Sequence, residues 1–154
     1  MTPRSMGLVA LLASSGCALN DSQERFVRFD GYVVDKDQNL AFVSPIDDTQ
    51  RPFAEAETHC TGLTLAGVTD WRLPTLEEIT NIRDESAKTA EDPPYVDTEA
   101  FPSTPCGPFW TQGEFDSASH WVIDFCSESG GSLANAASGW VRCASELAAS
   151  KADL

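Results

Sequence analysis

The cysteines of this 154-residue chain are the residues with the widest choice of chemistry: Cys17, Cys60, Cys106, Cys126 and Cys143. A thiol forms a disulfide, binds a metal or acts as a nucleophile. None of the five stands in a Cys-x-x-Cys pair and no histidine-rich segment accompanies them, so the sequence does not indicate a zinc site. With Cys17 set aside, an even number remains. Such a number is typical of two disulfides in an exported domain, and three pairings are open.

The N-terminal segment 1–16 predicts a secretory signal peptide. It has a basic start at Arg4, then an apolar stretch over residues 6–13, then small residues before Cys17. The apolar stretch is too short to span a bilayer. Ser14-Ser15-Gly16-Cys17 resembles a bacterial lipobox, which implies lipidation of Cys17 and an anchor in the lipid bilayer. Ordinary cleavage, leaving Cys17 as an odd thiol, is the alternative. We therefore expect an exported protein at the bacterial outer membrane, or at the cell surface or in the periplasm.

The net charge restricts the class of partner. The chain has 24 acidic and 10 basic side chains, for a formal net charge of −14. Such a field repels nucleic acid and anionic lipid headgroups, and it suits cations or a basic partner. The alternative is that these carboxylates only form a solvated acidic surface.

Strands are predicted at both ends of the domain. Apolar runs at 31–35 and 40–43, separated by Asp- and Asn-bearing turn residues, predict a β-hairpin. Towards the C-terminus, aromatic and β-branched residues predict strands at 110–111, 120–125 and 139–143.

Two helices are predicted between these strands. Pro52 suits the first position of a helix that carries Phe53, Ala56 and Cys60 on one face. The second helix covers residues 75–82, where Thr75 and Glu78 form a capping box.

The remaining segments are predicted to lack regular structure. Residues 17–28 form a tether, and residues 29–145 form a single domain. Within that domain, the acidic and proline-bearing stretch 84–108 is a long loop, and loops of this length are typically functional. Residues 146–154 form a flexible tail.

Three short motifs carry a resemblance to a known family. A helix of aromatic and alanine residues ends in Cys60, Asp70-Trp71-Arg72-Leu73-Pro74-Thr75 opens a second helix, and Phe109-Trp110-Thr111 precedes a closing Val141-Arg142-Cys143. In this order they resemble the Lcl C-terminal domain family of bacterial secreted proteins, over residues 30–145.

The resemblance implies a fold and a disulfide pattern. The implied fold is α+β and C-type-lectin-like, akin to that of formylglycine-generating enzymes, with two helices flanking a small twisted antiparallel sheet with long loops. In such domains the cysteine of the first helix pairs with that of the last strand, which here implies Cys60–Cys143. Cys106–Cys126 would then tie the long loop to the sheet.

The motif residues are interpreted as architectural. Large aromatic side chains on strands usually pack in a core, and an arginine beside them usually pairs with a carboxylate or with loop carbonyls. We expect this of the core motif Trp71, Arg72, Leu73, Pro74, Trp110 and Trp140. A tryptophan left exposed would instead stack on a sugar ring.

A group of acidic residues near the C-terminal strands raises the question of a calcium site. Glu114, Asp116 and Asp124, with Glu128 nearby, stand around the last strands, where C-type lectins carry calcium. Calcium takes six to eight oxygen ligands, several from carboxylates. The Glu-Pro-Asn and Trp-Asn-Asp ligand motifs of lectins are absent, so we expect no cofactor and interpret these carboxylates as solvated.

The function expected is non-catalytic recognition or adhesion outside the cytoplasm. An unidentified protein or glycan ligand would bind at the 84–108 loop and at the sheet edge near 112–120. The acidic surface disfavours sulfated glycosaminoglycans, which an adhesin of the family binds. A structural envelope lipoprotein without a ligand is the alternative. A thiol enzyme akin to the formylglycine-generating enzymes is more remote, because Cys126 and Cys143 are expected in disulfides and His59 and His120 stand in no catalytic motif.

Overall fold

The hairpin predicted near the N-terminal end forms the middle of a four-stranded antiparallel sheet. The computed structural model describes residues 24–84, 92–127 and 129–147. Strands β2 (Tyr32–Asp35) and β3 (Leu40–Val43) pair with each other as predicted. Strand β1 (Phe26–Phe29) pairs with β2, and β7 (Ala144–Glu146) pairs with β3, so the strand order is β1-β2-β3-β7.

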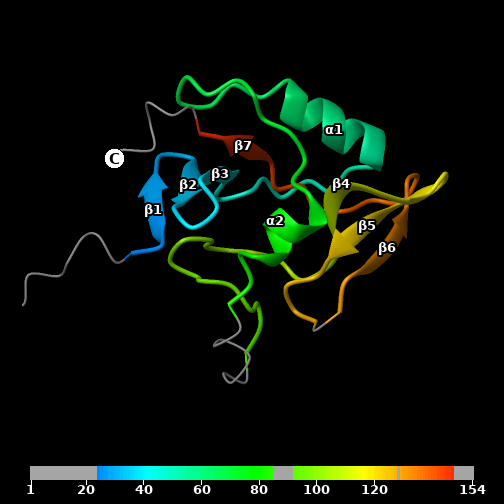
Figure 1. Ribbon diagram of the computed structural model, residues 1–154. Coiled ribbons are helices and arrows are strands. Elements are labelled where there is room, and N and C mark those ends of the chain that lie inside the picture. The colour runs from blue at the N-terminus through cyan, green and yellow to red at the C-terminus, as the bar shows by residue number, and fades with distance from the viewer. Residues whose placement is uncertain (1–23, 85–91, 128, 148–154) are drawn as a thin grey trace, which may run out of the picture.

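A second antiparallel sheet has three strands, β4 (Phe109–Asp116), β5 (Ser119–Ile123) and β6 (Gly131–Ala134), in that order. Figure 1 shows the two sheets on either side of the short helix α2 (Leu76–Thr80), with α1 (Phe53–Thr61) running above β4. The fold is α+β, as predicted. It has two small sheets, where the family resemblance implies one.

The two sheets are separate because residues 139–143, predicted as the last strand, do not form a continuous strand between them. Residues 139–143 make single bridges instead of a continuous pairing: Gly139 pairs with Arg51, and Trp140 with Phe109. From Ala144 onwards the chain pairs as a strand with β3. This segment therefore passes from one sheet to the other and extends neither.

Strand β6 was not predicted, because Gly130 and Gly131 indicate a turn. The short run from Gly131 carries small side chains and one leucine. Its strand conformation follows from pairing with β5, where Leu133 lies opposite His120.

Apolar side chains pack on both faces of each sheet, because neighbouring residues of a strand point to opposite sides. On the side of α1, the buried cluster consists of Tyr32, Ala41, Phe53, Ala56, Cys60, Trp71, Leu73, Trp110, Val122, Val141 and Cys143. On the side of α2, it consists of Val33, Leu40, Phe42, Ile79, Ile82, Val96, Ala100, Phe101, Phe109, Ile123, Phe125 and Ala144. The helices thus cover opposite faces.

The helices begin where the sequence predicts. Helix α1 follows Pro52 and buries Phe53, Ala56 and Cys60. At α2 the capping box is complete, because Thr75 and Glu78 each accept a hydrogen bond from the other's backbone amide. Helix α2 ends at Thr80, before the predicted residue 82. There the chain tightens into a turn in which the Arg83 amide donates to the Thr80 carbonyl at 3.0 Å.

Two predicted boundaries need correction. The predicted tether 17–28 ends in β1, which is a strand because it pairs with β2 along its whole length. Just before it, Arg25 donates two hydrogen bonds, of 2.9 and 2.6 Å, to the buried carboxylate of Asp35. The predicted tail 146–154 begins inside β7, where Glu146 lies opposite Leu40.

The predicted signal peptide and the lipidation site Cys17 lie outside the described residues. Within the described ranges, no helix is long and apolar enough to cross a membrane.

Candidate functional site

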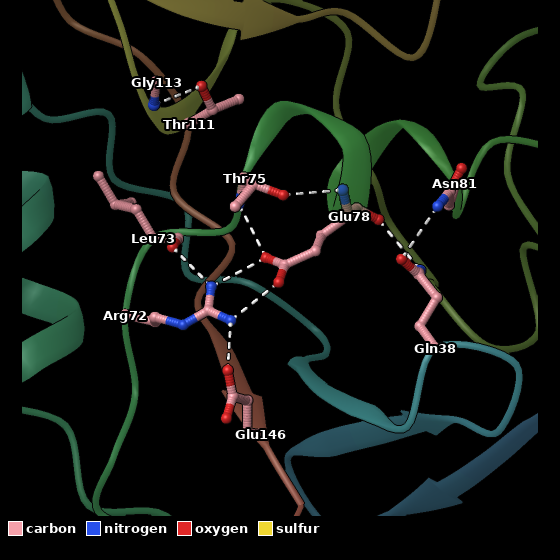
Figure 2. A network of polar contacts seen from close by, with 9 residues as sticks. All are labelled: Gln38, Arg72, Leu73, Thr75, Glu78, Asn81, Thr111, Gly113 and Glu146. Carbon is pink, nitrogen blue, oxygen red and sulfur yellow. Dashed lines mark hydrogen bonds and ion pairs between the residues drawn. The ribbon is translucent and has the colours of Figure 1, made fainter.

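Arg72 and Glu78 form the centre of a polar network (Figure 2). The Arg72 guanidinium donates two hydrogen bonds of 2.8 Å to the Glu78 carboxylate and one of 3.2 Å to the Leu73 carbonyl. The hydrogen bond with Glu78 raises the pKa of Arg72. Burial alone would raise the pKa of Glu78, but hydrogen bonds from Arg72 and Thr75 outweigh it and lower that pKa. The pair is therefore charged at neutral pH, and it ties the motif to the start of α2.

The backbone around Arg72 joins the two sheets. Arg72 exchanges hydrogen bonds of 2.9 and 2.8 Å with Ala144 at the start of β7, and the Pro74 carbonyl accepts one of 2.9 Å from Gln112 in β4. Between them Leu73 is buried, as is Trp71, whose indole N–H donates to the Val68 carbonyl at 3.0 Å. Residues 71–74 of the motif therefore have a structural role, since their backbone hydrogen bonds connect the two sheets and the side chains of Trp71 and Leu73 are buried.

The two downstream tryptophans of the motif set also have structural contacts. Trp110 is fully buried, and its indole N–H donates to the Arg51 carbonyl at 2.7 Å. Trp140 is partly buried, and its indole N–H donates to the Cys106 carbonyl at 3.0 Å. The Trp110 ring is therefore inaccessible to a ligand, and the Trp140 ring is held in place by the loop at Cys106.

The structure contains two disulfides, Cys60–Cys143 and Cys106–Cys126, which are the pairs that the family resemblance implies. The first is buried between α1 and the segment before β7. The second lies at the surface, where Cys106 is exposed and Cys126 partly buried. All four sulfurs are bonded, so the fold leaves no thiol among them for nucleophilic chemistry.

The carboxylates considered for calcium do not form a metal-binding group among the described residues. Glu114 and Asp116 are exposed on β4. The Asp116 carboxylate accepts a hydrogen bond of 2.8 Å from the Ala118 amide, which lowers the pKa of Asp116. Asp124 accepts hydrogen bonds from the amides of Gly107 and Cys126. Across the described part of the chain no three His, Cys, Asp or Glu side chains converge, and Glu128 lies outside it.

Two cavities lie away from β4, β5 and β6. One, of about 560 Å³, contains three arginines and four acidic residues among its lining residues: Glu24, Arg25, Phe26, Arg28, Ile82, Arg83, Asp84, Asp97, Glu99 and Ala100. It includes part of the predicted 84–108 binding loop, of which residues 85–91 lie outside the described ranges. The other, of about 490 Å³, lies between the turn at 37–39, helix α2 and Glu146.

An aromatic patch, formed by Phe115 and Trp121, lies on the β4–β5 hairpin. Phe115 is 50 % exposed, more than any other large apolar side chain of the described residues. Its ring meets the partly buried Trp121 ring edge-on, with centroids 4.7 Å apart and planes at 89°. Gly113 lies beside Trp121 and has no side chain to cover the indole; a Cβ there would lie 3.4 Å from Trp121 Cδ1.

The local backbone explains how an aromatic side chain becomes exposed at this point. The β4–β5 pairing shifts register on both sides of Glu114, so that β4 is irregular where it approaches the turn. Irregularities of this kind redirect side chains at the ends of sheets. The sequence predicted a binding edge at 112–120 without singling out Phe115. The available signal was an aromatic residue flanked by Glu114 and Asp116, just before a turn.

Arg142, which belongs to the closing Val141-Arg142-Cys143 motif, is a buried cation. Its guanidinium donates hydrogen bonds of 2.8 Å to the Val43 carbonyl and 2.9 Å to the Thr104 hydroxyl, and it lies over the ring of Phe101 at 4.8 Å. Complete burial lowers the pKa of Arg142 to about 9. These contacts place Arg142 at the junction of β3 and the loop before β4, as a part of the core.

Comparison with known protein families identifies a match over the region that contains the three motifs. The Lcl C-terminal domain model matches residues 31–145, which include both sheets apart from β1 and the last residue of β7. No curated protein matches the chain. The matched region contains the Arg72 network, both disulfides and the aromatic patch. The chain therefore belongs to the Lcl C-terminal domain family.

Proposed function

We propose that this protein is a non-catalytic recognition domain of a bacterial envelope lipoprotein, anchored through Cys17, and that its fold is C-type-lectin-like. The ligand binds on the β4–β5 hairpin. The observation that carries the proposal is the half-exposed Phe115 over Trp121, on a scaffold whose other motif residues are engaged in structural contacts. An exposed aromatic pair on a rigid sheet is typical of binding surfaces.

The extracytoplasmic part of the proposal is supported by the cysteines. Two disulfides fit a protein that resides in an oxidising compartment. They also disfavour the thiol-enzyme alternative, since Cys126 and Cys143 are both bonded and neither is available as a nucleophile.

A structural lipoprotein without a ligand remains the competing function, and site-specific photo-crosslinking separates the two. Phe115 is replaced by a photoreactive phenylalanine analogue in cells that produce the full-length protein. Phe29 on β1 is the matched control, because it is also an exposed phenylalanine. The proposal expects a discrete light-dependent adduct from position 115 and none from position 29.

The other outcomes contradict the proposal in different ways. No adduct at either position favours the structural alternative. An adduct at position 29 alone would show that the β4–β5 hairpin is not the binding surface.

A further inference from the structure

The aromatic patch lies in a part of the chain that has no basic side chain of its own apart from histidine. From residue 89 to residue 141 there is no Lys or Arg, whereas eight residues are Asp or Glu. All of β4, β5 and β6 falls within this stretch. The one histidine there, His120, is stacked on the Phe53 ring, and its Nδ1 lies 2.7 Å from Asn135 Oδ1. No Lys or Arg of this sheet therefore occupies the aromatic patch.

Two carboxylates accompany the exposed phenylalanine. Glu114 and Asp116 flank Phe115 in sequence, and both side chains are exposed. The lowered pKa of Asp116 keeps that carboxylate ionised at neutral pH. A cation at this end of β4 is therefore attracted by the exposed aromatic ring and by two exposed carboxylates that lie within one residue of it along the chain, and these attractions have the same sign.

From this juxtaposition we infer that the hairpin recognises a basic peptide segment of a partner protein, by stacking a Lys or Arg side chain on the Phe115–Trp121 patch. The exposed carboxylates of Glu114 and Asp116 attract the other basic side chains of the same segment. The inference rests on the proposed function and names the ligand class of the same surface.

A peptide segment fits this surface better than a small molecule. Phe115 is half exposed on a hairpin, and the two cavities described above contain no residue of β4, β5 or β6, so a small ligand placed on the Phe115 ring would keep much of its surface in water. The patch lies on a hairpin at the side of the molecule (Figure 1), where an extended segment can approach it. The net charge of −14 adds long-range attraction for a basic partner.

The test uses purified protein and three synthetic peptides of equal length, rich in Lys, rich in Glu, or made only of Gly and Ser. Binding is measured by calorimetry, and the Trp121 indole N–H is followed by NMR. We expect the Lys-rich peptide alone to bind, to shift the Trp121 signal, and to bind more weakly as salt is added. Phe115→Ala lowers the affinity about fivefold, and Phe115→Tyr restores it.

A matched pair of charge variants separates local recognition from diffuse attraction. Glu114→Gln with Asp116→Asn removes two charges at the patch, and Glu55→Gln with Glu57→Gln removes two from exposed positions of α1. The first pair is expected to weaken binding clearly more than the second. Equal losses from both pairs, with no effect of Phe115→Ala, would overturn the inference.

Further outcomes separate failure of this inference from failure of the proposed function. Binding of a neutral oligosaccharide or of the Glu-rich peptide in a Phe115-dependent manner overturns the basic-segment inference and leaves the recognition surface in place. An adduct at position 115 in cells, with no affinity for the Lys-rich peptide, has the same meaning. Absence of both adduct and peptide binding contradicts both proposals.

Discussion

The guanidinium of Arg142 is buried without an ion pair to any carboxylate of the described residues. Arg142 is fully buried, and among the described residues its polar partners are the Val43 carbonyl and the Thr104 hydroxyl. Replacing it by Ala leaves both groups without their donor and removes packing against Phe101. We predict that Arg142→Ala lowers the free energy of unfolding by about 3 kcal/mol, measured by urea denaturation.

Two further variants test the reason for this loss. Arg142→Lys keeps the positive charge, but an ammonium group cannot reach both acceptors as the planar guanidinium does. Its free energy of unfolding is therefore expected to lie between those of Arg142→Ala and the wild type. Arg28→Ala, at an exposed arginine that donates to the Glu99 carbonyl, serves as the control and is expected to cost about 0.5 kcal/mol or less. An Arg142→Ala protein as stable as the wild type would show that the buried cation contributes nothing.

The Glu78 carboxylate makes stability depend on pH in the acid range. Its pKa in the folded protein is lowered from its usual value of 4.5, so its contribution is fully present above about pH 4.5 and is lost as the pH falls below that value. We predict that wild type exceeds Glu78→Gln in unfolding free energy by about 1 kcal/mol at pH 7, and that this difference shrinks below pH 4.5. Thermal melts of both proteins from pH 7 to pH 3 measure it. A difference that stays constant with pH contradicts the assigned ion pair with Arg72.

At the scale of elements, the two disulfides differ in accessibility and therefore in ease of reduction. Cys60 and Cys143 are 0 % and 1 % exposed, whereas Cys106 is exposed at the surface. We predict that mild reductant opens Cys106–Cys126 first, and that Cys60–Cys143 opens only when the protein unfolds. Alkylation followed by peptide mass spectrometry of the native protein identifies which cysteines react. Simultaneous reaction of all four would contradict the prediction.

The disulfides also differ in what they connect. Cys60–Cys143 closes a sequence separation of 83 residues, and Cys106–Cys126 one of 20. On the chain-entropy model, removing the longer bridge costs about 4.5 kcal/mol and the shorter about 3 kcal/mol. Cys106→Ser with Cys126→Ser is therefore expected to remain folded with a lower melting temperature. Cys60→Ser with Cys143→Ser also loses buried contacts in the core on the α1 side and is expected to be the less stable pair.

At the scale of the whole molecule, the N-terminal segment predicts that the mature protein is anchored to a membrane through Cys17. We expect intact-mass analysis of the natively produced protein to show acylation at Cys17 and both disulfides. A mature protein that begins at another residue, without lipid, would contradict the anchor. This measurement uses the full chain and does not depend on the ligand.

Much of the fold could be predicted from the sequence, because several of its elements depend on local patterns. The hairpin at 31–43, the buried face of α1 and the capping box at Thr75 follow from local patterns, and each is confirmed. The division into two sheets could not be predicted, because it depends on long-range bridges such as Gly139 with Arg51. The strand at Gly131–Ala134 has too little pattern of its own.

The candidate site was predictable only as a region. Residues 112–120 are an acidic edge before a turn, which indicated a surface. The exposure of Phe115 depends on the register shifts of β4 and on how Trp121 packs beneath it. Neither can be derived from spacing, since an aromatic residue in a strand has the same local pattern whether it is buried or exposed.

The pairing of β3 with β7 has a consequence for how the protein matures. Residues 40–42 pair with residues 144–146. The backbone of Arg72 hydrogen-bonds with Ala144, and Cys60 forms its disulfide with Cys143. A chain that emerges from its N-terminal end, during synthesis or passage across a membrane, has no complete first sheet until residues 144–146 have appeared. The first sheet, the Arg72 bridge and the Cys60–Cys143 disulfide then form together, once that segment is present. A product cut short before residue 143 would lack one edge strand, one cross-link and the bridge between the sheets, and quality-control proteases would meet it as an unfolded chain.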